Sequence, residues 1–193
     1  MKNKKTFFII ALVFVLLIGG ATVLYRQLGK NIAAEQLATQ STNQSDESAA
    51  GETEQKIKAP DFTVYDADGN EVHLADYIGK PIVLNFWASW CGPCQSEMPD
   101  FHEKYLELGD DVHFLMINMT DGARETVESA SAFIAKNGYA FQVFYDTKSD
   151  AASIYGAYSL PTTFFIDADG YAIAQATGAI DAETLQRGLD MIK

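Results

Sequence analysis

The sequence predicts an α/β domain, with a mixed sheet flanked by helices, preceded by one transmembrane helix. Apolar, strand-like runs alternate with segments of helical periodicity between residues 58 and 193, and hairpin signals stand at both ends of that region. Near the N-terminus, an apolar stretch is about as long as a bilayer core is thick. The chain has 193 residues and is 48% hydrophobic, which is enough for one buried core in the larger region.

The N-terminal region is expected to be a membrane anchor formed by residues 1–26. Residues 7–25 are almost entirely apolar and follow three lysines, so the positive-inside tendency places the N-terminus in the cytoplasm and the rest outside. Arg26 and Lys30 on the far flank weaken this asymmetry. The alternative is a cleavable signal peptide, with small residues at 19–21 near a cut. The apolar run continues past that point, which favours an uncleaved, single-pass anchor.

A polar linker is predicted at residues 27–57. It is rich in Ala, Gln, Ser, Thr, Asn and Glu, has no aromatic residue, and lacks the apolar surface needed to fold. We expect a flexible tether that reaches roughly 30 Å on average. It leads into an acidic domain, because residues 57–193 carry 21 Asp and Glu but only 8 Lys and Arg. A net charge of −13 argues against a nucleic acid as partner.

The first half of the domain, residues 58–193, begins with a predicted hairpin. Strands at 62–65 and 72–74 flank the turn signal Asp68-Gly69. The apolar run 81–88 predicts a strand buried on both faces. A helix is expected to follow it. Its apolar side chains at helical spacing are Met98, Phe101, Tyr105 and Leu108.

The second half of the domain continues the alternation of strands and helices. Strands are predicted at 112–117 and 141–145, and between them a helix at 126–136 ends at Asn137-Gly138. A second hairpin joins strands 162–166 and 171–176. The last helix is expected to start at Asp181 as its N-cap, with a buried stripe formed by Leu185, Leu189 and Ile192.

Cys91 and Cys94 are the only cysteines in the chain, and two residues separate them. In a helix this spacing brings their Cα atoms to roughly 5 Å, inside the window of about 4.4 to 6.8 Å that a disulfide tolerates. At the helix N-terminus, unpaired N–H groups and the helix dipole lower the pKa of a thiol, so Cys91 is the expected nucleophile. Cys94, one turn further in, suits the resolving thiol.

Two plainer interpretations of the cysteines compete with redox chemistry. A structural disulfide that closes so short a loop stabilises the fold little. A tetrahedral zinc site needs two further ligands, and the three histidines, His73, His102 and His113, show no ligand spacing. Redox chemistry is therefore the favoured interpretation, and we expect neither a metal nor a cofactor.

From about residue 58 to the end, the chain resembles the TlpA/ResA-like family of membrane-anchored thioredoxins. Four motifs carry the resemblance: Pro60-Asp61-Phe62, the run NFWASWCGPC at residues 85–94, Glu97-Met98-Pro99 and Leu160-Pro161-Thr162. The resemblance implies a thioredoxin fold with an N-terminal β-hairpin. It also implies a central strand-helix insertion between Val112 and Tyr145, and the activity of a thiol-disulfide oxidoreductase.

The resemblance also implies a substrate-binding role for the segment before the strand 162–166. In this fold the proline that matches Pro161 is cis and stands beside the cysteine pair. The backbone of Leu160 would then pair with an extended segment of the substrate. The alternative is a proline that simply starts a strand.

Two polar residues bear on proton transfer. Thioredoxins proper have a buried carboxylate at the position that matches Asn85, and an amide cannot ionise to replace it, so Asn85 is expected to be a core residue. Glu97 matches an acidic residue of the ResA-like group and lies on roughly the same helix face as Cys94. Desolvated there, it would exchange protons with the cysteines at neutral pH. The alternative for Glu97 is an exposed position on the helix.

The two tryptophans are expected to differ in role. Trp90 adjoins the nucleophile, and we expect it to offer apolar contact surface to a polypeptide substrate. Trp87 lies in the predicted buried strand and is assigned to the core.

These features together predict an extracytoplasmic enzyme that reduces disulfides in protein substrates. The Gly-Pro pair between the cysteines resembles that of reducing thioredoxins, whose potentials are about −270 mV rather than the roughly −120 mV of strong oxidants. The resemblance implies a membrane protein as thiol-electron donor, supplied by cytoplasmic thioredoxin. It offers three classes of substrate: apocytochrome c, oxidised secreted proteins and surface methionine sulfoxide reductases.

Three other functions are weighed against this one. A disulfide-forming oxidase would use the same residues. A non-enzymatic carrier would bind Cu(I) through the two cysteine sulfurs. A peroxiredoxin would need a Thr or Ser and a Pro before one cysteine, an arrangement that Ala88-Ser89-Trp90 does not supply.

Overall fold

The computed structural model describes residues 37–39 and 56–193, which belong to one compact unit spanning residues 36–193. The predicted anchor, residues 1–26, lies outside the described residues, as does most of the predicted linker. Within the ranges described, every helix is too short or too polar to cross a bilayer.

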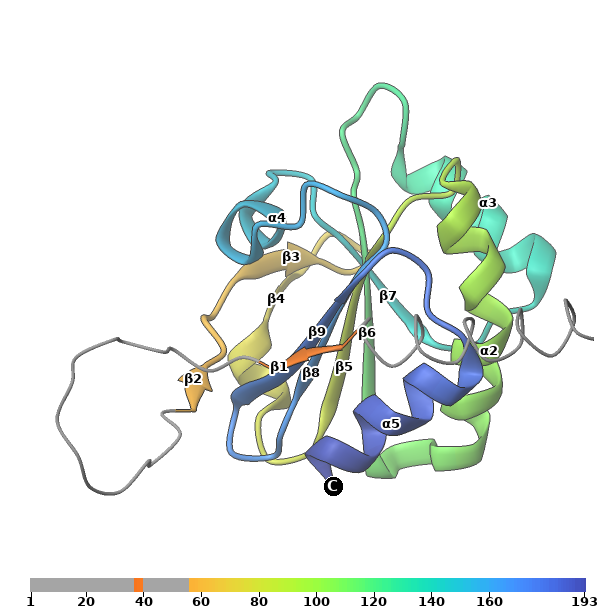
Figure 1. The fold of residues 1–193 in the computed structure, drawn as a ribbon. Helices are drawn as coiled ribbons and strands as arrows, with labels where there is room; N and C mark the ends of the chain where they lie inside the picture. The colour runs from red at the N-terminus through yellow and green to blue at the C-terminus, as the bar shows by residue number, and fades with distance from the viewer. Residues whose placement is uncertain (1–36, 40–55) are drawn as a thin grey trace, which may run out of the picture. The chain divides into compact units, whose positions relative to one another are not determined.

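One mixed sheet organises the described residues. Its strands follow the order β1-β9-β8-β5-β6-β7-β3-β4, and β2 also pairs with β9 (Figure 1). The strands in this part of the chain are β1 (Ala38–Thr39), β2 (Ile57–Lys58), β3 (Thr63–Tyr65), β4 (Glu71–His73), β5 (Ile82–Trp87), β6 (His113–Asn118), β7 (Gln142–Tyr145), β8 (Thr162–Ile166) and β9 (Tyr171–Thr177).

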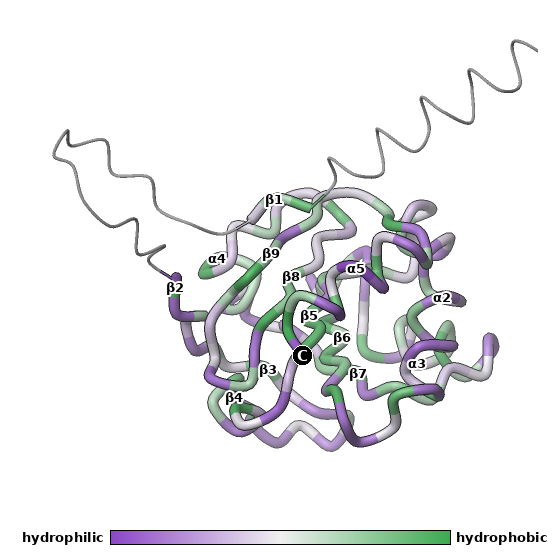
Figure 2. The backbone as a smooth tube through the Cα atoms, turned by 60° about the horizontal axis from the view of Figure 1, so that its bottom comes forward, coloured by the Kyte–Doolittle hydropathy of each residue, from purple (hydrophilic) through white to green (hydrophobic). Residues whose placement is uncertain are grey.

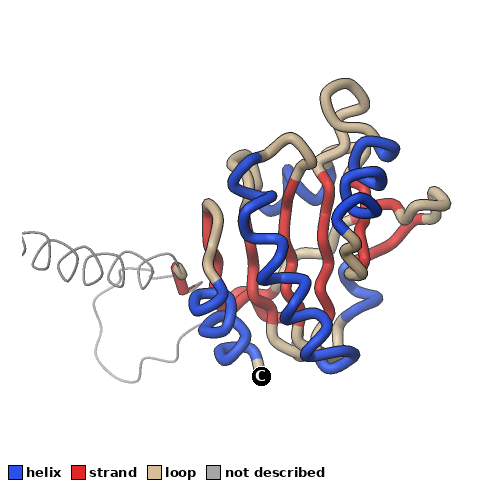
Figure 3. The backbone as a smooth tube through the Cα atoms, turned by 90° about the vertical axis from the view of Figure 1, so that its right-hand side faces the viewer, coloured by secondary structure: helices blue, strands red, loops and turns tan. Residues whose placement is uncertain are grey.

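Helices cover both faces of this sheet. In the described ranges they are α2 (Gly92–Leu108), α3 (Val127–Asn137), α4 (Asp150–Tyr155) and α5 (Ala182–Ile192), with 3-10 turns η1 (Leu74–Tyr77) and η2 (Gly109–Asp111). The buried side chains of α2, α3 and α5 pack into one core cluster, and those of α4 and η1 pack into another on the opposite face. Figure 3 shows α2 crossing the sheet in front of the central strands.

Strand β5 lies between β8 and β6 near the centre of the sheet, and all six of its side chains are buried. It pairs in parallel with β6 and antiparallel with β8. Val83 and Trp87 pack into the cluster under α2, whereas Leu84 and Phe86 pack into the opposite cluster. The prediction of a strand buried on both faces is therefore confirmed. The hydrophobic colour in Figure 2 is concentrated along these central strands, and the hydrophilic colour lies on the helices and turns around them.

The sheet is widened on the far side of β6. Strand β7 pairs in parallel with β6, and the β3–β4 hairpin joins the sheet through a contact between β3 and β7. Helix α3 connects β6 to β7 and packs on the same face as α2. Helix α3 and strand β7 lie between Val112 and Tyr145, where the family resemblance implies a strand-helix insertion, and the β3–β4 hairpin stands where it implies an N-terminal β-hairpin.

The predicted ends of two helices are confirmed. Asp181 is the N-cap of α5, and its carboxylate accepts a hydrogen bond from the N–H of Thr184 at 2.8 Å. Helix α3 ends at Gly138, which has a left-handed conformation with φ of 69°. Both residues satisfy backbone groups that would otherwise lack a partner at the helix end.

Besides the 3-10 turns, one α-helix and two strands of the described residues were not predicted. Helix α4 has only six residues and buries two alanines, so its apolar pattern is too short to recognise. Strands β1 and β2 have two residues each and pair antiparallel with β9. Part of the segment predicted to be a linker, Ala38–Thr39 and Ile57, therefore lies in the sheet.

Candidate active site

The two cysteines form a disulfide at the start of α2. Their Cα atoms are 5.3 Å apart, close to the distance expected from the helical spacing. Cys91 is the N-cap of α2, and its Sγ accepts a hydrogen bond from the N–H of Cys94 at 3.2 Å. Pro93 lies in the first turn, where the missing N–H costs nothing because that position has no partner within the helix.

The two sulfur-bearing residues differ in exposure. Cys91 is 5% exposed and Cys94 is fully buried, and both belong to the core cluster under α2. Trp90, directly before Cys91, is 41% exposed, whereas Trp87 at the end of β5 is fully buried. The exposed surface next to Cys91 therefore belongs to the aromatic ring of Trp90, and Cys94 has no exposed surface.

Glu97 is buried one turn of α2 beyond Cys94, with only 2% of its surface exposed. The alternative of an exposed helix residue is therefore wrong. Its Oε1 accepts a hydrogen bond from Nδ2 of Asn85 at 2.8 Å, and its Oε2 accepts one from the N–H of Ile180 at 3.0 Å. Burial raises the pKa of Glu97 to about 7, and the two hydrogen bonds offset part of that rise. The carboxyl group can therefore gain or lose a proton near neutral pH.

Asn85 lies in the core on the α2 face of β5, as predicted. Its Nδ2 donates to Glu97 and also to Oγ1 of Thr163 in β8, at 3.0 Å. The Oδ1 of Asn85 is buried and has no hydrogen-bond partner among the described residues. The Asn85 side chain thus links β5 and β8 to Glu97, and its Oδ1 is left as an unused hydrogen-bond acceptor.

Pro161 is buried next to the strand that leads to the cysteines. The Leu160–Pro161 peptide bond is cis, as the resemblance implies. Thr162, the next residue, pairs with Phe86 near the end of β5, so the turn before β8 lies beside the loop that follows β5. Leu160 is half-buried and packs against both core clusters.

The described part of the chain contains no group of three or more His, Cys, Asp or Glu side chains placed to hold a metal ion.

Comparison with known proteins places the chain in a family. Residues 56–174 match the sequence profile of the AhpC/TSA family. The thiol-disulfide oxidoreductase ResA of Geobacillus thermodenitrificans is 36% identical over 136 residues, which are 70% of this chain and 76% of that protein. The chain is a ResA-like member of the AhpC/TSA family.

Solved structures agree with this ResA-like assignment. A thiol:disulfide interchange protein DsbE from Chlorobium tepidum superimposes with a TM-score of 0.63 and 30% identity, covering 72% of this chain and 97% of that one. The exposed lipoprotein thioredoxin of Streptococcus pneumoniae superimposes with a TM-score of 0.57 and 32% identity, covering 68% of this chain and 98% of that one. The ResA-like chain is therefore a thiol-disulfide oxidoreductase with a thioredoxin-like fold, and proteins that carry disulfides are its class of substrate.

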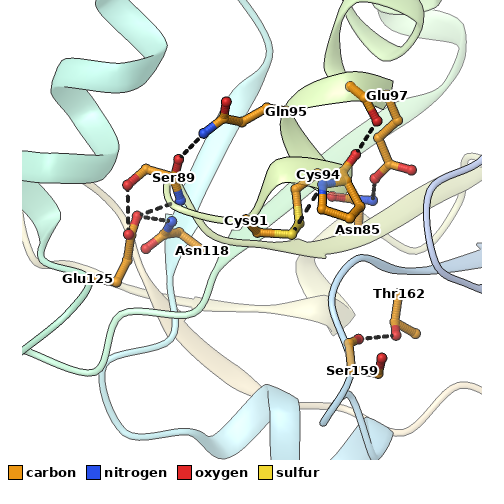
Figure 4. Close-up of a disulfide and its surroundings, with 12 residues drawn as sticks. Asn85, Ser89, Cys91, Cys94, Gln95, Glu97, Asn118, Glu125, Ser159 and Thr162 are labelled. Carbon is orange, nitrogen blue, oxygen red and sulfur yellow. Dashed lines mark hydrogen bonds between the residues drawn. A yellow bond between two sulfur atoms is a disulfide. The ribbon is translucent and has the colours of Figure 1, made fainter.

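Sequence reasoning missed a second buried carboxylate near the cysteines of the ResA-like domain. Glu125 is fully buried and accepts hydrogen bonds from Ser89 and Asn118. Figure 4 shows this group on one side of the disulfide and Glu97 with Asn85 on the other. In the sequence, Glu125 stands just before the N-cap Thr126, where an acidic residue is ordinary. No local signal marks its contact with Ser89, 36 residues away.

Proposed function

We propose that this ResA-like chain is an extracytoplasmic reductant of protein disulfides, with Cys91 as nucleophile and Cys94 as resolving thiol. One observation carries the proposal: the two sulfurs occupy different environments. Cys91 Sγ lies at the N-terminus of a 17-residue helix and accepts a hydrogen bond from a backbone N–H, which favours its thiolate. Cys94 is fully buried, so a partner protein meets Cys91 first.

The exchange moves two electrons in two steps. The Cys91 thiolate attacks one sulfur of the substrate disulfide, forms a mixed disulfide and releases the other substrate sulfur as a thiolate. The Cys94 thiolate then attacks Sγ of Cys91, which forms the Cys91–Cys94 disulfide and releases the second substrate sulfur. The structure corresponds to the oxidised product of this cycle.

Glu97 is proposed as the proton acceptor for Cys94. The resolving thiol must lose a proton before it attacks, and Asn85 cannot accept it because an amide does not ionise. Glu97 lies on the same helix one turn beyond Cys94, and its pKa of about 7 suits proton transfer at neutral pH.

Trp90 and Leu160 are proposed to bind the substrate polypeptide. Trp90 places an exposed ring directly beside Cys91. The backbone N–H and C=O of Leu160 have no hydrogen-bond partner within the described ranges, so both are available to an extended segment. Trp90 and Leu160 would both hold the substrate disulfide next to Cys91.

The direction of electron flow is proposed to be reduction. The Gly92-Pro93 pair between the cysteines is that of reducing thioredoxins, which supports a potential of about −270 mV. A reductant outside the cytoplasm needs a continuing supply of electrons, so we propose a membrane protein with a reactive thiol pair as donor.

Attachment to the cell membrane, with the catalytic domain outside, is also proposed. The apolar stretch at residues 7–25 and the lysines before it support a single-pass anchor. A similar structure is that of an exposed lipoprotein. Labelling of intact cells with a membrane-impermeant thiol reagent tests the location: reduced Cys91 should react without lysis, and labelling that requires lysis would contradict the proposal.

The central experiment is a substrate trap. Cys94→Ser leaves Cys91 able to form the mixed disulfide but unable to release it, so substrates should accumulate as adducts that a reducing agent dissociates. Mass spectrometry then distinguishes apocytochrome c, secreted proteins and methionine sulfoxide reductases. The matched control is the double variant with Cys91→Ser, which should trap nothing. A Cys94→Ser protein that captures no disulfide-bearing protein would contradict the proposal.

The redox potential separates the alternatives. A value near that of thioredoxin supports reduction, whereas a value of about −120 mV would favour a disulfide-forming oxidase. A Cu(I) carrier would bind Cu(I) tightly through the two cysteines and would fail to reduce insulin disulfides. Both measurements use the purified protein and need no knowledge of the substrate.

A further inference from the structure

The loop between β6 and α3, residues 119–126, packs against the loop that carries Cys91. The N–H of Met119 donates to the carbonyl of Trp87 at 2.9 Å, so the two loops leave the sheet side by side. Further along, Oδ1 of Asp121 accepts hydrogen bonds from three successive backbone N–H groups, those of residues 123–125, at 2.7 to 2.9 Å. These contacts hold the loop in a tight turn whose last part faces the active site.

Glu125 is the residue of this turn that reaches the active-site loop. Its Oε1 accepts from the N–H of Ser89 at 3.0 Å and from Nδ2 of Asn118 at 2.8 Å, and its Oε2 accepts from Oγ of Ser89 at 2.7 Å. All three partners donate, which is the pattern that an ionised carboxylate accepts. The side chain is fully buried, so the loss of any of these bonds would leave a buried polar group without a partner.

The three bonds connect parts of the molecule that surround the nucleophile. Ser89 lies two residues before Cys91, and its carbonyl also accepts a hydrogen bond from Nε2 of Gln95 in α2 at 2.6 Å. Asn118 is the last residue of β6, and its Oδ1 accepts from Oγ1 of Thr120 at 2.7 Å. The carboxylate therefore fixes the loop that contains the N-cap of α2 to the end of a central strand (Figure 4).

The residue before Glu125 contacts the same loop from outside. The guanidinium carbon of Arg124 lies 3.5 Å from the centre of the Trp90 ring, which is a cation–π contact. Arg124 and Glu125 thus hold two successive residues of the active-site loop, Trp90 on its exposed side and Ser89 on its buried side. The position of the Trp90 ring depends on the same turn that presents Glu125.

We propose that Glu125 is a positioning residue for thiol-disulfide exchange, which holds Ser89 so that Cys91 keeps its place as N-cap of α2 and Trp90 stays against Arg124. The proposal rests on the proposed role of Cys91 as nucleophile. Glu125 does not touch the substrate in this scheme. It acts through Ser89, because the acidity of the Cys91 thiol depends on its alignment with the first N–H groups of the helix.

Replacement of Glu125 by Gln and by Ala separates geometry from simple loss of charge. A Gln side chain keeps one oxygen for the N–H of Ser89 and for Asn118, and its amide can donate to Oγ of Ser89. Glu125→Gln should therefore retain most of the arrangement, whereas Glu125→Ala removes all three acceptors. Glu128→Ala is the matched control, since it removes an exposed glutamate from the first turn of α3.

The measurement is the rate at which Cys91 of the reduced protein is alkylated by iodoacetamide, followed from pH 4 to 9. In Glu125→Ala, the reactivity profile should move to higher pH, and the rate at pH 6 should fall roughly tenfold or more. The alkylation rate of Glu125→Gln should stay within about threefold of that of the unsubstituted protein, and the rate of Glu128→Ala should equal that of the unsubstituted protein. Unfolding in urea is recorded for each variant, so that a change in reactivity is read only from folded protein.

Several outcomes would overturn the proposal. A folded Glu125→Ala with an unchanged profile does so, and so does a Glu125→Gln that is as impaired as the alanine variant. If Glu125→Ala does not fold, Ser89→Ala decides, because it removes one of the same bonds: lowered reactivity supports the proposal and unchanged reactivity overturns it. An unsubstituted protein whose Cys91 reacts like free cysteine would instead refute the role of Cys91 as nucleophile.

Discussion

Glu97 and Glu125 show how two buried carboxylates can serve one site in different ways. Glu97 accepts two hydrogen bonds, and burial raises its pKa to about 7. Glu125 accepts three, all from groups next to the active-site loop or the end of β6. We therefore propose proton transfer for Glu97 and positioning for Glu125, which lie on opposite sides of the disulfide (Figure 4).

The raised pKa of Glu97 predicts how stability depends on pH. In the unfolded chain this carboxyl ionises near pH 4.5, whereas in the folded protein it ionises near pH 7. Between these values the folded state holds a proton that the unfolded state has lost, so the free energy of unfolding falls as pH rises. The contribution is fully present below pH 4.5 and is lost by about pH 7.

Glu97→Gln should remove this pH dependence. The free energy of unfolding of the variant minus that of the unsubstituted oxidised protein should be about 2 to 3 kcal/mol larger at pH 8 than at pH 5. Urea unfolding at the two pH values measures the change. Glu103→Gln, at an exposed position of the same helix, is the control and should show no such gain. A stability difference between Glu97→Gln and the unsubstituted protein that is the same at both pH values would contradict the prediction.

At the scale of single residues, the sequence predicts the cysteine pair well because its two members are local. Cys91 and Cys94 are joined by one turn of helix, and that turn decides both their distance and their unequal exposure. The burial of Glu97 depends on Asn85 and Ile180, which lie 12 and 83 residues away, so the sequence left two interpretations open. The contacts of Glu125 are with Asn118 and Ser89, which lie 7 and 36 residues away, and its role was not predicted.

Helix α5 provides a prediction at the scale of elements. Gly188 faces the sheet, and a Cβ atom at this position would lie 2.2 Å from atoms of the Phe165 ring in β8. Phe165 is fully buried, so its ring has little room to move. The close approach of α5 to β8 therefore requires glycine at this position.

Gly188→Ala should destabilise the protein although alanine is the better helix former. The gain in helix propensity is about 1 kcal/mol, whereas overpacking in a filled core typically costs about 1 to 3 kcal/mol and more when a rigid ring is in the way. We expect a net loss of about 2 kcal/mol in thermal or urea unfolding. Gly92→Ala is the matched control, because a Cβ there meets no atom within 4 Å. Equal stability of the two variants would show that α5 can shift away from Phe165.

The elements that the sequence predicts correctly have a long, regular pattern or, like the β3–β4 hairpin, a clear turn signal. Strand β5 has six consecutive buried residues, and α5 carries its apolar residues on one face below a capping aspartate. Helix α4 is held instead by Asp146, whose carboxylate accepts hydrogen bonds from the N–H groups of Asp150 and Ala152. Strands β1 and β2 owe their existence to the free edge of β9. The residues of β1 and β2 form no sequence pattern that predicts a strand.

At the scale of the whole molecule, β1 and β2 protect the outer edge of the sheet. Both run antiparallel to β9, and β2 is reinforced by an ion pair of 2.9 Å between Lys56 and Asp167. The N–H of Ala59 also donates to the carbonyl of Gly170 at 2.9 Å. An uncovered edge strand exposes unpaired N–H and C=O groups, so these short strands close the sheet on that side.

Two fragments test the contribution of this edge. A fragment of residues 36–193 should fold and unfold cooperatively, whereas one of residues 60–193 lacks β1 and β2. Hydrogen exchange should show protection of the β9 amides that face the lost strands falling by roughly tenfold or more, because their acceptors are gone. Amides of the central strand β6 are the internal control and should change little. Equal protection of β9 in both fragments would contradict the prediction.

The complete burial of Cys94 has a kinetic consequence. An electron donor and an electron acceptor must both react at Cys91, the one of the two cysteines that has any exposed surface, next to Trp90. The two partners therefore exclude each other, and no ternary complex can form. Turnover should follow a ping-pong scheme, in which double-reciprocal plots at several donor concentrations give parallel lines and each partner inhibits at high concentration by occupying the wrong redox form.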